Sequence, residues 1–343
     1  GSGVDVVIQD GGCQVDHPDF TDSNGVSRVQ QIDWYTASGV SGTMPPFNEF
    51  YRDTVGHGTH VTGITSGKTY GRAKNARIYI MTVSGLAGFG VTGIPITDCF
   101  DTIKGWHINK PIDPALGYKR PTVVNMSWGY NSTFSAINGG VYRGTPWSGN
   151  TPQMQYGMVG NGIGAFGARV ASVDVDVAEL LAAGVVLCGA AGNFYQTQDV
   201  PGGPDYDNYF NSLYFGPTYY MRGSSPPAAP GVISVGSVDI DYTGPLEQKA
   251  PYSDSGPRVD LYAPGTYIVS TLSTAYEQAF QDFPYGIAQY PFNSSFRIAN
   301  ISGTSMASPN VAGLAAQLLQ IYPTATPAQI RQKIIDTTQP NML

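Results

Sequence analysis

Short runs of apolar, largely β-branched residues recur along this chain of 343 residues, and helical patterns separate them. Most of these runs are apolar at successive positions, which is typical of strands covered on both faces. Strands that alternate with helices favour βαβ units and a mostly parallel sheet, and therefore an α/β fold. The expected strands are residues 4–8, 78–83, 122–127, 185–190, 232–238 and 259–261.

The segments between these strands predict helices. Thr326 stands where an N-cap residue is preferred, and Pro327 follows it at the first helical position. Gly184 suits the residue just past the end of another helix. The expected helices are residues 57–67, 97–108, 173–183, 305–321 and 327–336.

Three long stretches, residues 131–166, 194–229 and 273–300, interrupt this pattern. The first holds eight glycines and one charged residue, Arg143. Because no repeat and no linker-like change of composition divides the chain, we expect one domain, residues 1–343, that carries these stretches as long loop insertions. The chain opens Gly-Ser-Gly directly before an apolar strand, so we expect the natural polypeptide to have an upstream segment that is missing here.

The composition argues against a nucleic-acid partner. The formal net charge is −7 and no run of Lys or Arg exceeds two residues, whereas a phosphate-binding face needs clustered basic side chains. No stretch approaches the roughly 18 uninterrupted apolar residues of a membrane span. Cys13, Cys99 and Cys188 show no CxxC spacing, so we expect three small buried side chains.

Three short segments carry residue types suited to nucleophilic catalysis. The segment VVIQDGG at 6–12 ends an apolar strand with Asp10, and GHGTHVTG at 56–63 sets His57 between two glycines. The segment GTSMASP at 303–309 places Ser305 in the first turn of an apolar helix. A serine nucleophile needs an adjacent base that a third group orients. Each segment alone also fits a turn or a helix cap, so the inference depends on all three together.

These segments resemble the Asp, His and Ser signatures of the subtilisin-like serine proteases, the subtilase family. Segments 56–63 and 303–309 match the family motifs almost letter for letter, while Gly11 stands where Ser or Thr is usual. The resemblance spans nearly the whole chain and implies a three-layer fold, with a mostly parallel central sheet and helices on both faces. Further matching segments are 17–20, 125–129, 190–193, 231–239 and 263–265.

The resemblance implies a role for each matching residue. Ser305 attacks the scissile carbonyl, His57 transfers the proton, and Asp10 orients the imidazole. Asn193 donates its side-chain amide to the oxyanion, together with the backbone N–H of Ser305. His60 lies inside the helix that His57 begins, so we expect it to be structural.

A polypeptide substrate is implied as well, bound as an extended strand between two backbone edges. The P1 pocket is expected between residues 127–129 and 190–192. Its walls carry no charge, which predicts an apolar or broad P1 preference. Trp128 stands where Leu is common in relatives and alters the width of neighbouring pockets. The expected substrate-binding residues are Gly88, Phe89, Gly90, Ser127, Trp128, Gly129, Ala190, Ala191 and Gly192.

This chemistry requires no cofactor, and the sequence assigns no metal site. Bound Ca²⁺ is possible because many relatives hold it at loop carboxylates, and Asp19 matches one ligand position in some of them. Asp205, Asp207 and Asp241 are further candidates, although solvation at the surface explains these three more simply.

Two other functions fit the same features. A structural or binding module of a larger polypeptide or assembly can retain a protease fold, and the long loops rich in Gly, Tyr and Pro suit that role. The intact set of Asp10, His57, Asn193 and Ser305 favours an enzyme instead. Esterase or peptide ligase activity needs the same residues and is not separated by the sequence. We expect a secreted, surface or particle-associated protein.

Overall fold

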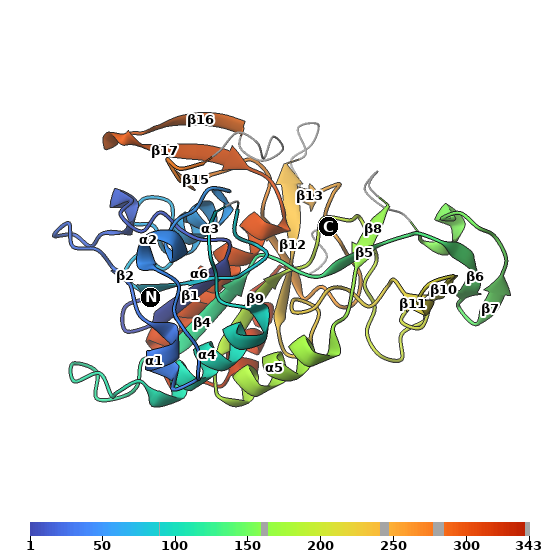
Figure 1. Ribbon diagram of the computed structural model, residues 1–343, viewed down its shortest axis with the longest axis horizontal. Helices are drawn as coiled ribbons and strands as arrows, with labels where there is room; N and C mark the ends of the chain where they lie inside the picture. The colour runs from blue at the N-terminus through green and yellow to red at the C-terminus, as the bar shows by residue number, and fades with distance from the viewer. Residues whose placement is uncertain (89, 159–163, 241–246, 277–284, 340–343) are drawn as a thin grey trace.

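The computed structural model of this chain describes residues 1–88, 90–158, 164–240, 247–276 and 285–339. Its central sheet has the strand order β13-β12-β9-β4-β1-β3-β2, with β14 beside β12 (Figure 1). The pairs are parallel except β12 with β13. The strands are β1 (Asp5–Asp10), β2 (Val29–Gln30), β3 (Arg77–Thr82), β4 (Thr122–Met126), β9 (Val186–Ala190), β12 (Ile233–Ile240), β13 (Glu247–Lys249) and β14 (Leu261–Pro264).

Five of the six strands expected from the sequence are present, as β1, β3, β4, β9 and β12, and the sixth, expected at residues 259–261, is displaced to β14, which begins at Leu261. Every residue of β1, β4 and β9 is buried, which accounts for their continuous apolar runs. The three cysteines are free thiols inside the protein, as expected. Among the described residues, no helix combines the length and the apolar character needed to cross a membrane.

The five expected helices are also present, as α3 (His57–Ser66), α4 (Ile96–Asn109), α5 (Ala171–Ala182), α6 (Thr304–Ile321) and α7 (Pro327–Asp336). Thr326 caps α7 as predicted, because its side chain accepts a hydrogen bond from the backbone N–H of Gln329. The sequence analysis missed the short elements, which carry too few residues for a periodic signal. These are α1 (Trp34–Ser38), α2 (Phe47–Phe50), η1 (Pro18–Phe20) and η2 (Met154–Tyr156).

The connections place helices on both faces of the sheet. The chain passes from β1 to β3 in one direction and then from β3 to β4 and β9 in the other. Because crossovers between parallel strands are right-handed, α3 covers one face while α4 and α5 cover the other. Helix α6 packs against α3 and against β4, β9 and β12. The three-layer α/β fold is therefore confirmed, and its direction reverses between β1 and β4, where open α/β sheets bind ligands.

The first two stretches expected to be loops together build a second sheet, with the order β11-β10-β6-β7. It lies at one end of the molecule (Figure 1). The expectation of loops there was wrong, because glycines and a proline obscure the strands and each strand pairs with a remote partner. The strands are β6 (Ile137–Tyr142), β7 (Thr145–Trp147), β10 (Tyr209–Ser212) and β11 (Gly216–Tyr219). An apolar cluster of their own supports them: Phe134, Ile137, Trp147, Met158, Phe166, Phe210, Tyr220 and Met221.

Two smaller sheets complete the fold. Strand β5 (Asn131–Thr133) pairs with β8 (Ala165–Gly167) at the base of the first insertion. The third stretch expected to be a loop contains β16 (Tyr285–Tyr290) and β17 (Asn293–Ile301), which form a sheet with β15 (Ile268–Leu272). Strand β15 packs against α3, so this sheet covers the helix that begins at His57.

Candidate active site

Asp10 and His57 contact each other at the carboxyl edge of the sheet. Asp10 ends β1 and His57 begins α3. The Nδ1 atom of His57 lies 2.9 Å from Oδ1 and 3.0 Å from Oδ2 of Asp10. The backbone N–H of Gly11 donates to Asp10 Oδ1 at 2.7 Å. The carboxylate is therefore held in a fixed orientation toward the imidazole.

Glycines allow the start of α3 to approach the end of β1. A Cβ atom at Gly58 would lie 2.0 Å from the carbonyl oxygen of Gly12 and 3.2 Å from Asp10 Oδ1. Gly12 has φ +132°, and a Cβ there would lie 2.2 Å from the carbonyl oxygen of Arg52. Larger residues at these two positions would push the helix away from the strand. The glycines of the two motifs therefore set the Asp10–His57 contact.

Asp53 holds the first turn of α3 and was missed by the sequence analysis. Its Oδ1 atom accepts the N–H of Gly56 at 2.7 Å. Its Oδ2 atom accepts the N–H of Thr59 at 2.8 Å and the hydroxyl of Thr59 at 2.6 Å. An Asp just before a helix is the usual type of residue for capping free N–H groups, so a signal was present.

The environment of His57 favours its protonated form. Burial disfavours the imidazolium, but the charge of Asp10 and the hydrogen bond to it outweigh burial and raise the pKa of His57 above its ordinary value. His60 behaves in the opposite way: burial lowers its pKa to about 3. Its Nε2 atom lies 3.0 Å from the carbonyl oxygen of Ala299. His60 is thus a neutral side chain packed inside the protein.

Ser305 lies in the first turn of α6. Its hydroxyl donates to the carbonyl oxygen of Ser127 at 3.1 Å, and the hydroxyl of Ser127 donates to the carbonyl oxygen of Ser305 at 2.8 Å. Ser127 directly follows β4, which neighbours β1. This reciprocal pair therefore holds Ser305 at the same edge of the sheet as Asp10.

A cavity of about 160 Å³ adjoins these residues. It lies outside the carboxyl ends of β1 and β4, where the direction of the connections reverses. Asp10 and His57 line this cavity together with Ser127, whose carbonyl oxygen accepts the hydrogen bond of the Ser305 hydroxyl. The lining residues are Asp10, Val55, His57, Leu86, Ser127 and Trp128.

Asn193 lies three residues after β9 and contacts the start of α6. Its Oδ1 atom accepts the N–H and the hydroxyl of Thr304, each at 2.9 Å. These two donors identify the oxygen of the amide, so its NH₂ group faces away from Thr304. A Cβ atom at Gly303 would lie 3.3 Å from Asn193 Nδ2. The amide donor thus lies beside the turn that carries Ser305.

Asp254 fixes the segment that follows Asn193, and no sequence motif marked it. This carboxylate is fully buried. Its Oδ1 atom accepts the N–H groups of Phe194 and Gln196, each at 2.9 Å. Its Oδ2 atom accepts the Gln198 amide at 2.8 Å. Burial raises the pKa of Asp254 to about 7, so its charge changes near neutral pH.

Two of the nine expected substrate-binding residues line the 160 Å³ cavity. Ser127 and Trp128 line it, but residues 190–192 do not, so this cavity differs from the expected P1 pocket. Ala190 ends β9, and Ala191 and Gly192 lead to Asn193. Gly129 packs against Ser224, and Gly88 against Thr54, while Gly90 has φ +72°. Phe89 lies outside the described residues.

The surroundings of Asp19 do not fit Ca²⁺. Its Oδ1 atom accepts the N–H of Thr69 at 3.0 Å and the hydroxyl of Tyr290 at 2.9 Å. The guanidinium of Arg28 donates to the carbonyl oxygen of Asp19 at 3.4 Å. Of the two Asp19 carboxylate oxygens, Oδ2 alone is buried without a hydrogen-bond partner among the described residues, whereas calcium takes 6–8 oxygen ligands.

The other carboxylates considered for calcium are paired with arginines or lie outside the structure. Asp205 accepts two hydrogen bonds from Arg143, and Asp207 accepts one from Arg222. Asp241 lies outside the described residues. Within the described part of the chain, no group of three or more His, Cys, Asp or Glu residues is arranged to hold a metal ion.

Comparison with known proteins identifies the same family across the chain. The model of the subtilase family matches residues 1–343. The extracellular serine proteinase of a Thermus species is 27% identical over 343 residues, which cover 100% of this chain and 57% of the relative. A subtilisin-like serine protease of Cochliobolus lunatus is 28% identical, over 94% of this chain and 45% of the relative.

The remaining comparisons agree. A cuticle-degrading protease of Metarhizium anisopliae is 26% identical, over 100% of this chain and 60% of the relative. The chain thus spans about half the length of the curated relatives it matches. The crystal structure of a cold-adapted subtilisin-like serine proteinase covers 100% of this chain and 84% of its own, with a TM-score of 0.59 at 24% identity, which shows a shared fold. Because the family model matches from the first residue to the last, this chain belongs to the subtilase family.

Proposed function

We propose that this chain is a serine endopeptidase that cleaves polypeptides through Asp10, His57 and Ser305 by way of an acyl-enzyme. The observation that carries the proposal is the Asp10–His57 contact at 2.9 Å beside a cavity that is also lined by Ser127, whose carbonyl oxygen accepts the Ser305 hydroxyl. Membership of a family whose relatives are named as proteases supports it. The proposal extends to polypeptide substrates and to the role of each residue.

The first step is the attack of Ser305 on the scissile carbonyl. Because His57 Nδ1 faces Asp10, the proton of the neutral imidazole stays on Nδ1, and Nε2 is left as the base. The Ser305 hydroxyl turns from the Ser127 carbonyl to Nε2 and transfers its proton there as its oxygen bonds to the carbonyl carbon. Asp10 stabilises the imidazolium that forms, in agreement with the raised pKa of His57.

The negative charge then develops on the former carbonyl oxygen. The Asn193 amide and the backbone N–H of Ser305 donate to it, and the positive end of the α6 dipole lies at the same place. The imidazolium returns its proton to the leaving amine as the C–N bond breaks. Water repeats the sequence on the ester and releases the second product.

A fluorophosphonate probe, which bonds to an activated serine, tests the proposal. We expect the wild-type protein to be labelled and Ser305→Ala not to be labelled. Ser302→Ala is the matched control, because Ser302 lies three residues earlier and its hydroxyl accepts the N–H of Tyr267. Labelling of Ser305→Ala, or none of a wild type shown to be folded by circular dichroism, would contradict the triad.

Residues 127–129 and 190–192, the expected walls of the P1 pocket, carry no charged side chain, which supports a preference for apolar or varied residues at P1. The cavity beside His57, which neighbours this pocket at Ser127 and Trp128, adds the apolar side chains Val55 and Leu86. In a peptide library we expect cleavage after apolar residues, or after many residue types, and we expect Trp128→Ala to broaden the profile further by widening the cavity. A profile dominated by Lys or Arg at P1 would refute this expectation.

We also propose that the protein acts outside the cell. Its relatives include proteins named extracellular serine proteinase and cuticle-degrading protease. Fractionation of the producing organism into cells and medium, followed by the same probe, tests the location. Labelled protein confined to the cells would exclude secretion.

A further inference from the structure

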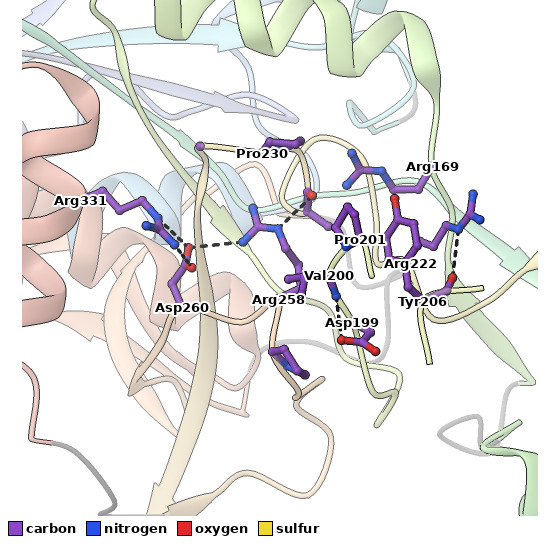
Figure 2. A pocket seen from close by; sticks show the side chains of 13 residues that line it. Arg169, Asp199, Val200, Pro201, Tyr206, Arg222, Pro230, Arg258, Asp260 and Arg331 are labelled. Carbon is purple, nitrogen blue, oxygen red and sulfur yellow. Dashed lines mark hydrogen bonds and ion pairs between the residues drawn. The ribbon is translucent and has the colours of Figure 1, made fainter. Parts of the chain in front are cut away.

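A second cavity, of about 220 Å³, is lined by residues that precede two strands of the central sheet (Figure 2). Ala228, Pro230 and Gly231 line it just before β12 begins, and Pro257 and Asp260 line it just before β14. Strand β12 runs parallel to both β9 and β14. The cavity therefore lies at the amino ends of these strands, whereas Asp10, Ser127 and Asn193 lie at carboxyl ends.

Positive side chains dominate the lining of this cavity. Arg169, Arg222, Arg258 and Arg331 line it, against two carboxylates, Asp199 and Asp260. This concentration is unusual in a chain with 18 basic residues and a net charge of −7. The four arginines come from separate segments of the chain, and Figure 2 shows Arg331 next to Asp260 while Arg169 and Arg222 lie beyond Pro201. Their grouping is therefore a product of the fold.

Arg258 and Arg331 share one carboxylate. Arg258 donates to Asp260 at 3.4 Å, and Arg331 also donates to Asp260. The remaining bonds of Arg258 go to backbone carbonyl oxygens, including that of Ala229 at 2.7 Å. Burial and the nearby charges of Arg169 and Arg331 lower the pKa of Arg258, against the opposite effect of Asp260. These three cations thus lie close enough to repel one another.

Arg222 and Arg169 complete the positive wall with N–H groups to spare. The Arg222 guanidinium carbon lies 3.4 Å from the ring centre of Tyr219 and 4.6 Å from that of Tyr206. Its Nη2 atom donates to Asp207 at 2.6 Å. Arg169 donates through Nη2 to Asp174 at 2.7 Å. Within the described ranges, Nε and Nη1 of Arg169 and Nη1 of Arg222 have no acceptor.

We propose that this cavity binds a small multivalent oxyanion, such as phosphate or a polycarboxylate. Guanidinium groups bind such oxygens through two parallel N–H bonds and with little loss of hydration. The anion supplies the acceptors that Arg169 and Arg222 lack and offsets the repulsion around Arg258. Because these residues come from the insertion, the edge of the central sheet and the segment before α5, a bound anion links the three and stabilises the fold.

Thermal unfolding in the Ser305→Ala background, which removes self-digestion, tests the proposal whether or not the chain is a peptidase. Sodium phosphate and sodium citrate are titrated at an ionic strength held constant with sodium chloride. We expect Tm to rise and then saturate with phosphate or citrate. Arg169→Gln is expected to weaken the apparent affinity about tenfold, since one charge-assisted hydrogen bond contributes about that factor.

Two control variants distinguish loss of the Arg169 charge from loss of an ion pair. Asp174→Asn removes the partner of Arg169 but keeps its charge, so the saturable rise in Tm should persist. Arg143→Gln breaks a comparable pair with Asp205 outside the cavity and should leave the affinity unchanged. Arg222→Gln repeats the test if Arg169→Gln does not fold.

The two anions distinguish the source of the ligand. A rise with phosphate alone indicates a phosphate site, and a rise with citrate alone indicates a carboxylate site. A linear rise without saturation, shared by all variants, is the general effect of excluded salts and would overturn the proposal. Equal affinity in Arg169→Gln, Arg222→Gln and the parent would overturn it as well.

Discussion

The two edges of the central sheet place their functional side chains in different ways. At the carboxyl edge, Asp10, Ser127 and Asn193 each lie at or just after the end of a strand, and short sequence motifs surround them. At the amino edge, four arginines converge from segments far apart in the sequence, and no motif marks any of them. Local backbone geometry sets the first arrangement and long-range packing sets the second. Variants at the first edge should therefore change chemistry, and variants at the second should change stability.

The largest expected effect at the carboxyl edge outside the triad is that of Asn193→Ala. It removes one oxyanion donor, so we expect kcat to fall about 10²–10³-fold, the range known for such a donor in subtilisin, with a small change in KM. Exposed Asn131→Ala is the matched control. Steady-state kinetics measure both, and an unchanged kcat in Asn193→Ala would remove the amide from the mechanism.

At the amino edge, Asp260→Ala should lower the free energy of unfolding. Asp260 accepts hydrogen bonds from Arg258 and Arg331 and is largely buried, so its removal leaves buried positive charge unpaired. We expect a loss of about 3 kcal/mol in denaturant unfolding. Asp207→Ala breaks an exposed pair with Arg222 and should cost less than about 1 kcal/mol. Equal losses would mean that the buried pair has no special role.

The smallest expected effect is a shift in the pH dependence of kcat/KM. His57 acts as a base only when neutral, and its pKa is raised, so activity should rise with pH with a midpoint above the ordinary value of 6.5. The carboxylates near His57 are Asp10 and Asp53. Because the pKa of Asp254 is raised to about 7, Asp254→Asn is the decisive variant. If kcat/KM still rises with pH in Asp254→Asn with the same midpoint, the rise reports His57. If the rise disappears in that variant, it reports Asp254. A wild-type midpoint below 6.5 contradicts the assignment to His57.

The sequence predicted the central sheet well because complete burial imposes a simple rule on each strand. The residues of β4 and β9 are buried on both faces, so their apolar runs mark them. Strands β6 and β7 were missed because two glycines interrupt one and a proline the other. The approximate place of His57 at the start of α3 was also predicted, because the glycines around it restrict the backbone.

The residues that hold the catalytic segments in place, Asp53 and Asp254, were not predicted. Asp254 is 61 positions from Asn193, and only the fold brings the two segments together. Asp53 had a weak local signal as a capping residue, but an Asp near a helix start is too common to indicate a function. Nothing in the sequence marked the arginines of the second cavity, because they are far apart along the chain and no motif surrounds them. Motifs thus identify residues that react, while those that hold them depend on contacts distant in sequence.

The sheet formed by the two insertions has a consequence for biosynthesis. Strand β6 pairs with β10, and Val141 lies opposite Tyr209. A ribosome adds roughly 5–20 residues per second, so β6 and β7 wait several seconds before their partner strand is made. During that delay one edge of β6 is unpaired, and Phe134 and Phe166 lack the ring contacts that Phe210 and Tyr220 later provide. The nascent chain therefore carries an exposed strand edge and uncovered aromatic rings until β10 has been made.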